Sequence, residues 1–376
     1  MRLTLLTPTL DQSGAEKQLT LLACGLKDTT SWDIDVVALT RGGPYQEVLE
    51  NHGIRVTVIG KRFRCDPSAW WKLKRYLRQT RPDILHTWMF TANAYGRLAA
   101  GPNPRFKIVT SERCVDSWKA GWQLRIDRML IKRTDHLLAN SAPVAEFYQQ
   151  VGYPKETLSV ISNGVKIPSP RNLELRQQLH AKWNLPQGAR VVAHVGRLAR
   201  QKRIDHLMWS FQQLQQLSEN TYFVIAGEGP ERAHLEDLAI RYTCDHLVRF
   251  VGHQPNGATL MDGIDLFWLG SDFEGMSNSL MEAMAAGVPA VVSDIPANRE
   301  LVIPEITGEL FPLGNRTAVA QLSDRILNNS SKYQLMSEAS AKRMRTEFGI
   351  EQMVTRHREL YERLMNTDQH SAREIN

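Results

Sequence analysis

Short runs of aliphatic and β-branched residues alternate along the chain with longer amphipathic segments. This alternation is typical of domains built on a parallel β-sheet with helical crossovers. The predicted strands of the first half are Leu3–Leu6, Ile34–Leu39, Arg55–Ile59, Ile84–His86, Lys107–Thr110, His136–Ala139 and Leu158–Ile161. Those of the second half are Arg190–Val195, Tyr222–Ala226, Val248–Val251, Asp265–Leu269 and Pro289–Ser293. Helices are expected between most of these strands, for example at Ala15–Leu26 and Pro143–Val151.

One turn-rich segment separates the two series of strands. The run Ser162-Asn-Gly-Val-Lys-Ile-Pro-Ser-Pro170 places a hinge near residues 163–170. The chain's 376 residues also exceed what one ordinary core holds. We therefore predict an α/β protein with two Rossmann-like domains and a cleft between them. The expected segments are a first domain at 1–167, a second at 168–350, and a C-terminal helix at 351–376 that packs back on the first domain and frays after Asn366.

The composition is that of a soluble globular protein, with 42% hydrophobic and 23% charged residues. No apolar run approaches the roughly 18 residues that a membrane span needs. The apolar start of the chain stops at Pro8 with no cleavage site after it, so we interpret it as a first strand rather than a signal peptide. The four cysteines are scattered, which argues against disulfides or structural zinc and favours a reducing, cytoplasmic location.

Positive charge is concentrated in the first half of the chain. Residues 1–168 hold 24 Lys and Arg against 15 Asp and Glu, a formal charge of +9, whereas residues 169–376 carry −3. This asymmetry predicts an anionic partner for the first domain. Nucleic acid is one such partner, but no nucleic-acid motif accompanies the charge. We therefore favour the inner face of the plasma membrane, on which the protein would be peripheral.

Residues 61–81 carry the densest basic pattern, with eight Lys or Arg and one Asp interleaved with Trp70, Trp71, Leu73 and Leu77. A basic helix with aromatic residues is typical of a membrane-surface segment. Helical spacing puts Trp70 on the face that suits the core and leaves Trp71 for the membrane. A second basic stretch, from Arg113 to Arg133, contains Trp118 and Trp122. The alternative is that the apolar residues pack on the sheet and the basic ones are simply solvated.

The richest chemistry lies between Ser271 and Gly287, where the sequence reads Ser-Asp-Phe-Glu-Gly-Met-Ser-Asn-Ser-Leu-Met-Glu-Ala-Met-Ala-Ala-Gly. A strand ends just before this segment, and a helix is predicted to begin near Ser279. Free N–H groups at a helix start attract anions. Glu274 falls in the loop, and Glu282 lies about one turn into the helix, where it suits hydrogen bonds from sugar or ribose hydroxyls. Alternatively, both acids merely favour a helix N-terminus.

Two further loops follow strands. Val195-Gly-Arg-Leu-Ala-Arg-Gln-Lys202 presents Arg197 and Lys202, which would neutralise a diphosphate as it leaves. The alternative is an ordinary solvated basic loop. In the first domain, Gly14 of Ser13-Gly-Ala-Glu16 permits close approach of the backbone to a ligand.

Taken together, these motifs resemble the retaining GT-B glycosyltransferases of family 4, also called glycosyltransferase group 1. Glu274 and Glu282 match the family's Glu-x7-Glu signature, and Gly196, Arg197 and Lys202 match its basic loop. Similar segments elsewhere are Phe223-Val-Ile-Ala-Gly-Glu-Gly-Pro230, Phe250-Val-Gly-His253, Ala139-Asn-Ser141 and Ile161-Ser-Asn-Gly-Val165. The resemblance covers nearly the whole chain. Two positions depart from the pattern: Ser277 replaces a common proline, and Ser111-Glu112-Arg113 stands where relatives often carry histidine.

The resemblance implies a role for each matching residue, with no metal or other cofactor. Arg197 and Lys202 would hold the donor pyrophosphate, Glu282 the ribose, and Glu274 the transferring sugar. The residues expected to be catalytic are Glu274, Arg197 and Lys202. Further donor-binding residues would be Gly14, Gly252, Met276, Ser277 and Asn278, with Phe250–His253 along the base. For the acceptor we select His86, at the end of a predicted strand, and Arg113, which follows another. The alternative for His86 is a hydrogen-bonded structural histidine, which is as common at a strand end.

The function implied is retaining transfer of a sugar from a nucleotide diphosphate sugar, expected to be UDP-linked, to a hydroxyl acceptor. The acceptor would be a saccharide or lipid-linked, in bacterial surface polysaccharide or glycolipid biosynthesis. The alternative on the same architecture is a nucleotide-sugar epimerase. A dinucleotide-dependent oxidoreductase would need Gly-x-Gly-x-x-Gly, and Gly227-Glu-Gly229-Pro230 lacks the third glycine. A non-catalytic nucleotide-binding module is disfavoured because the acids and cations of the site are all present.

Overall fold

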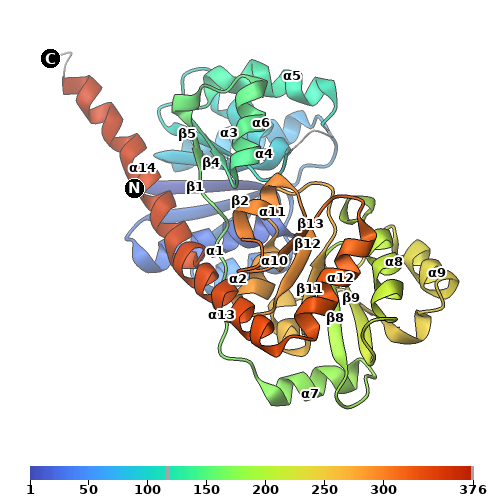
Figure 1. The fold of residues 1–376 in the computed structure, drawn as a ribbon. Coiled ribbons are helices and arrows are strands. Elements are labelled where there is room, and N and C mark those ends of the chain that lie inside the picture. Colours follow the sequence, from blue (N-terminus) through green and yellow to red (C-terminus); the bar gives the residue numbers. More distant parts are fainter. Residues whose placement is uncertain (116–118, 374–376) are drawn as a thin grey trace. The chain divides into compact units, whose positions relative to one another are not determined.

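The two series of strands form two separate parallel sheets in the computed structural model, which describes residues 1–115 and 119–373, with side chains as far as Asn366 (Figure 1). The chain divides into two compact units. Unit 1 comprises Met1–Gly164 together with Ile350–Asn376, and unit 2 comprises Val165–Gly349. Among the described residues, no helix is long and apolar enough to cross a membrane.

Unit 1 contains a seven-stranded sheet in the order β3-β2-β1-β4-β5-β6-β7. Its strands are β1 (Arg2–Thr9), β2 (Asp33–Arg41), β3 (Arg55–Val58), β4 (Ile84–Trp88), β5 (Lys107–Glu112), β6 (His136–Ala139) and β7 (Leu158–Val160). Its helices are α1 (Gly14–Thr29), α2 (Pro44–Asn51), α3 (Pro67–Thr80), α4 (Met89–Ala100), α5 (Gly121–Leu130), η1 (Ile131–Arg133), α6 (Ala142–Val151), η2 (Lys155–Thr157) and α14 (Ile350–Arg373). All seven strands overlap the predicted ones.

The alternation of side chains along β1 divides the core of unit 1 between the two faces of the sheet. Leu3 and Leu5 join the cluster that contains α1 and α14, whereas Leu6 joins the cluster that contains α3. Because helices cover both faces, side chains on both faces of the strand are buried. This explains why β1 lacks a strict alternation of apolar and polar residues, with Leu5 and Leu6 adjacent.

Helix α14 completes the core of unit 1. Met353, Val354, Leu360 and Tyr361 belong to the same cluster as β1. A Cβ on Gly25 would lie 2.5 Å from a methyl group of Val354, so a glycine is needed where α1 and α14 meet. Helix α14 continues to Arg373, and the fraying expected after Asn366 stays a prediction.

Unit 2 contains a six-stranded sheet in the order β10-β9-β8-β11-β12-β13. Its strands are β8 (Arg190–Val195), β9 (Thr221–Ala226), β10 (Val248–Gly252), β11 (Leu266–Leu269), β12 (Ala290–Ser293) and β13 (Glu309–Phe311). Its helices are α7 (Leu173–Lys182), η3 (Arg200–Lys202), α8 (Ile204–Leu214), α9 (Arg232–Arg241), η4 (Asp245–Leu247), η5 (Gly257–Gly263), α10 (Asn278–Ala285), α11 (Pro296–Leu301), α12 (Arg316–Leu327) and α13 (Ser330–Glu347).

One strand of unit 2 is missing from the sequence prediction. β13 has only three residues, and its partner β12 supplies the pairing that defines it. Such a short run carries no periodic signal of its own. The prediction of β8 to β12 is confirmed to within one residue at either end.

Both sheets have the strand order of a Rossmann fold. In such sheets, the chain leaves the central pair of strands in opposite directions, and the loops after their carboxyl ends diverge to leave room for a ligand. The switch points lie between β1 and β4 in unit 1 and between β8 and β11 in unit 2. The motifs of the sequence follow these strands.

Candidate functional site

Glycines bring three strand-end loops of unit 2 into backbone contact. The Gly196 N–H donates to Ala226 O at 2.9 Å, and the Gly227 N–H donates to Gly252 O at 2.8 Å. A Cβ on Gly227 would lie 1.8 Å from Gly196 O, and one on Gly229 would lie 2.2 Å from Leu198 O. The loops after β8, β9 and β10 can therefore stack only because these positions lack side chains.

An ion pair joins the two loops at the switch point of unit 2. Lys202, at the end of the loop after β8, pairs with Glu274 in the loop after β11. The Ser271 hydroxyl donates to the same Glu274 oxygen at 2.6 Å. The Asp272 N–H also donates to Gln201 O at 2.9 Å. Two residues that lie far apart in the sequence are thus held side by side.

Arg197 stands on the same loop as Lys202 and is exposed. Within the described part of the chain, its guanidinium has no hydrogen bond or ion pair, whereas the Lys202 ammonium is half-buried and paired. The loop therefore exposes Arg197 to solvent and holds Lys202 beside the carboxylate of Glu274. This arrangement suits an anionic ligand such as a diphosphate.

Helix α10 begins one residue earlier than predicted, at Asn278. Ser277 is its N-cap, and the Ser277 hydroxyl accepts a hydrogen bond from the Leu280 N–H at 3.4 Å. Met276 and Ser277 are buried, and Asn278 is half-buried. The serine that replaces the family's proline thus caps the helix, which proline cannot do, because it has no side-chain acceptor. The other N–H groups of this first turn face the end of the helix, where anions bind.

Glu282 lies on α10 close to the end of β8. A Cβ on Gly257 would be 3.2 Å from a Glu282 carboxylate oxygen and 3.3 Å from a methyl group of Val195. Glycine at position 257 therefore leaves room for the carboxylate. The sequence prediction did not identify Gly257, which begins the short helix η5.

His194 is a second residue that the sequence prediction missed. It is fully buried on β8, one residue before the strand ends. Burial, reinforced by the charge of Lys202, lowers the pKa of His194 to about 3. A polar residue within the otherwise apolar run of β8 is the signal that could have identified it.

Gly14 is the first residue of α1 in unit 1, directly after the loop that follows β1. Two residues later, Glu16 is buried and accepts hydrogen bonds from the Ser13 hydroxyl and, at 3.1 Å, from the Thr9 hydroxyl. Burial raises the pKa of Glu16 above its ordinary value. In unit 2, Gly252 ends β10 with a φ of +70°, a conformation that favours glycine.

The expectation that His86 binds the acceptor is not supported by its surroundings. His86 is fully buried; its Nδ1 lies 2.6 Å from the Tyr361 hydroxyl and its Nε2 lies 2.7 Å from the Ser111 hydroxyl. Burial holds the pKa of His86 well below its ordinary value. Both ring nitrogens have partners within unit 1, so His86 links α14 to the sheet, and its role toward an acceptor stays a prediction.

Arg113, the other residue selected for the acceptor, is half-buried just after β5. Its guanidinium lies 4.6 Å from the centre of the Trp88 ring and donates to Asn163 Oδ1. Burial lowers the pKa of Arg113 to about 9, which still leaves it protonated at neutral pH. Its role toward an acceptor stays a prediction.

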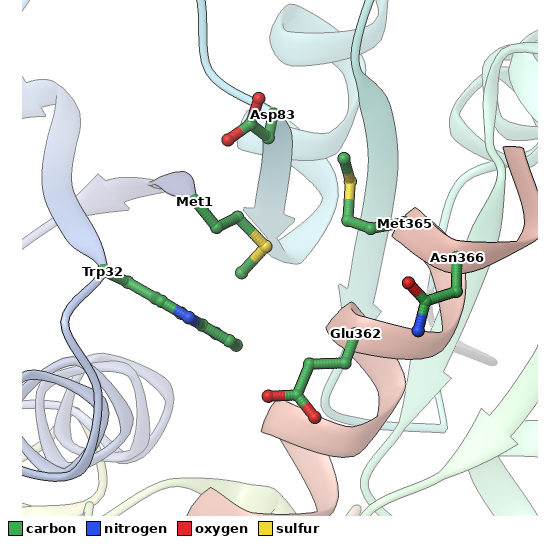
Figure 2. A pocket seen from close by; sticks show the side chains of 6 residues that line it. All are labelled: Met1, Trp32, Asp83, Glu362, Met365 and Asn366. Atoms are coloured by element: carbon green, nitrogen blue, oxygen red, sulfur yellow. The ribbon is translucent and has the colours of Figure 1, made fainter. Parts of the chain in front are cut away.

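A cavity of about 380 Å³ in unit 1 lies away from these loops (Figure 2). Met1, Trp32 and Asp83 line it from segments that precede β1, β2 and β4, and α14 supplies its other wall. It therefore lies at the amino ends of the strands, opposite the edge where Rossmann folds bind ligands. Across the described residues, no group of three or more His, Cys, Asp or Glu could hold a metal ion.

Two family models match the chain. The model of glycosyl transferases group 1 matches residues 176–343, and the model of glycosyltransferase family 4 matches residues 12–167. Together they cover parts of both units and include the loops after β8, β9, β10 and β11. The chain belongs to the group 1 glycosyltransferases of the GT-B fold, and it is an enzyme of sugar transfer.

Individual relatives are more distant. The chain is 23% identical over 305 residues to N-acetyl-alpha-D-glucosaminyl L-malate synthase of Bacillus anthracis, covering 79% of each protein. It is 24% identical over 295 residues to the lipopolysaccharide core biosynthesis glycosyltransferase LpsD of Rhizobium meliloti, covering 78% of this chain and 79% of LpsD. Among solved structures, Anabaena HepE in complex with UDP-glucose matches with a TM-score of 0.84 at 21% identity, covering 96% of this chain and 99% of HepE.

The stacked loops lead to a stability prediction. Replacing Gly227 by alanine should lower the unfolding free energy of unit 2, because the new Cβ would collide with the backbone oxygen of Gly196. The matched control is Gly314→Ala, where φ is also positive but no atom lies within 4 Å of the Cβ position. Gly227→Ala should lose about 1–3 kcal/mol more than the control in urea unfolding. Equal losses would show that the close approach of the loops contributes nothing.

Proposed function

We propose that this enzyme transfers a sugar from a UDP-sugar donor to a hydroxyl group of a saccharide or lipid-linked acceptor. The transfer would retain the anomeric configuration and need no metal. The observation that carries the proposal is the junction of the two loops at the switch point of unit 2. There, Lys202 and Glu274 form an ion pair beside the exposed Arg197.

The chemistry of each group fits a diphosphate donor. Arg197 offers a planar fork of N–H donors to phosphate oxygens, and the Lys202 ammonium acts as a compact second charge. The first turn of α10 adds backbone N–H groups. Glu282, beside the end of β8, would accept hydrogen bonds from the ribose, and Glu274 would contact the sugar. HepE, a structural neighbour, is solved with UDP and with UDP-glucose, which supports uracil as the base of the donor.

Retention without a covalent enzyme intermediate fits the state of Glu274. One oxygen of its carboxylate already accepts from Lys202 and from Ser271, which makes it a weak nucleophile. In the proposed step, the bond from the sugar C1 to the diphosphate oxygen breaks and the acceptor oxygen bonds to C1 on the same face. The leaving diphosphate takes the acceptor's proton. Arg197, Lys202 and the start of α10 stabilise the charge on that leaving group.

A membrane-proximal acceptor is supported by the surface of α3. Asp66 caps this helix by accepting from the N–H groups of Ser68 and Ala69. Ala69, Leu73 and Leu77 are buried against the sheet. Trp70 packs at the margin of this cluster, whereas Trp71 is 56% exposed, as its helical position predicted.

Basic and aromatic side chains continue from α3 onto its surroundings. Phe63, just before the helix, is exposed, and the Arg64 guanidinium lies 4.0 Å from the centre of the half-exposed Trp122 ring of α5. Trp118, from the second basic stretch, lies outside the described residues. Exposed basic residues here are Arg62, Arg64, Lys72, Arg75, Arg78 and Arg81. Such a mixture fits an anionic lipid surface. The names of relatives such as LpsD support synthesis of a surface polysaccharide or glycolipid.

Donor binding should depend on the two cations. We expect Arg197→Ala and Lys202→Met each to weaken UDP binding by about 1.5–3 kcal/mol, because a charge-assisted hydrogen bond to phosphate is lost. Isothermal titration calorimetry with UDP measures this loss. The control is Arg241→Ala, which removes an exposed arginine of α9 in the same unit. If Arg197→Ala binds UDP as tightly as the control, the assignment of the donor site fails.

Retention is tested on the product. Once a donor and an acceptor have been found by screening UDP-sugars, the new glycosidic linkage should have the same anomeric configuration as the donor. Proton NMR of the first product formed reads the configuration from the coupling of the anomeric proton. An inverted anomer would rule out the proposed mechanism while leaving sugar transfer intact.

Membrane docking is tested with vesicles that contain anionic lipid. The wild type should co-sediment at low salt and dissociate at high salt, because each basic residue near the surface contributes about 1 kcal/mol that salt screens. Reversing the charge of Lys72, Lys74, Arg75 and Arg78 should reduce binding without changing UDP affinity. A control that reverses four exposed basic residues of unit 2 carries the same net charge; it alters Lys182, Arg241, Arg325 and Lys342. Equal loss by both variants would show that net charge, rather than α3, attracts the protein.

A further inference from the structure

The two ring nitrogens of His194 have different surroundings. Nδ1 lies 3.2 Å from the backbone oxygen of Trp268. A carbonyl oxygen can only accept, so Nδ1 carries the proton and donates it. In the neutral ring, Nε2 is then a lone-pair acceptor and nothing else.

The acceptor Nε2 points beneath the basic loop. It lies 3.4 Å from the position of a Cβ on Gly196, the residue that begins this loop. His194 is fully buried, and Nε2 has no hydrogen-bond partner in the described part of the chain. Lys202 lies at the same end of the sheet, since its backbone oxygen is 3.2 Å from the position of a Cβ on Gly270, two residues after Trp268. Burial, together with the charge of Lys202, lowers the pKa of His194, so the ring stays neutral at physiological pH.

The chemistry of Nε2 restricts its partner. An ionised diphosphate has no proton to donate, so it cannot bind Nε2 directly. His194 is fully buried, so Nε2 is not exposed to solvent. The Lys202 ammonium is the cation that acts on this histidine, and it carries three N–H donors, of which one serves Glu274.

We propose that His194 is a positioning residue for Lys202: when the donor diphosphate binds, Nε2 accepts one ammonium hydrogen, Glu274 accepts a second, and the third is left for the phosphate. This proposal rests on the proposed function. His194 touches neither donor nor acceptor and acts only through Lys202. A buried acceptor with no partner costs free energy in the ligand-free protein, and such costs persist where the group serves a site.

The proposal predicts a loss of UDP binding that one variant causes and a second restores. His194→Phe keeps an aromatic ring but removes both the Nε2 acceptor and the Nδ1 donor to Trp268 O, so UDP should bind about tenfold more weakly. His194→Gln can place an amide oxygen near the position of Nε2 and should restore UDP affinity to near that of the wild type. His180→Phe is the control, since His180 belongs to the same unit but its Nε2 lies 2.9 Å from Gly263 O at the end of η5.

A double-mutant cycle with Lys202→Met separates positioning from packing. If His194 acts through Lys202, His194→Phe should have no further effect on UDP affinity once Lys202 is replaced. Equal loss in both backgrounds, or unchanged affinity with a lower Tm, would show a merely structural histidine and overturn the proposal. If the wild type binds UDP and Arg197→Ala weakens it but His194→Phe does not, this proposal fails and the proposed function stands. If the wild type does not bind UDP, both fail.

Discussion

The ion pair between Lys202 and Glu274 is the interaction on which the candidate donor site depends. It crosses the switch point of unit 2, where the loops after β8 and β11 would otherwise diverge. Both partners are mostly buried, so breaking the pair would leave an uncompensated charge in a poorly solvated place. Glu274 accepts one of the three ammonium hydrogens of Lys202, so an anion can bind another of them beside that carboxylate. A diphosphate, which the positive charge attracts, does so better than a single neutral sugar.

Unit 1 uses buried charges in a comparable way near the end of β5. Arg97 donates to Asp127 at 2.8 Å, and Lys119 lies 3.2 Å from the other oxygen of the same carboxylate. Lys119 also pairs with Glu112, the last residue of β5, at 3.5 Å. These groups balance in charge and link Lys119 and Glu112 to α4 and α5. The network pairs the buried carboxylate of Glu112.

Much of this arrangement could be predicted from the sequence. Strands of four to six mostly apolar residues, such as β8 and β6, are buried on both faces of a parallel sheet. They can therefore be predicted from the sequence alone. Glu274, Lys202 and Arg197 were identified because polar residues directly after buried strands suggest a ligand site. His86 looked similar in the sequence, but both of its ring nitrogens are hydrogen-bonded to Tyr361 and Ser111, which are distant along the chain.

The sequence by itself determined the two sheets, their helices and the family, because periodicity and strand-end motifs are local features of the chain. Only the tertiary structure decided which polar residues are available. Gly227 allows two loops to approach each other closely and is not part of a dinucleotide motif, since the carbonyl oxygen of Gly196 occupies the space of its Cβ. His194 has an acceptor nitrogen without a hydrogen-bond partner in the described part of the chain, whereas both ring nitrogens of His86 have partners. Hydrogen bonding depends on contacts between residues far apart in sequence, and those contacts exist only in the folded chain.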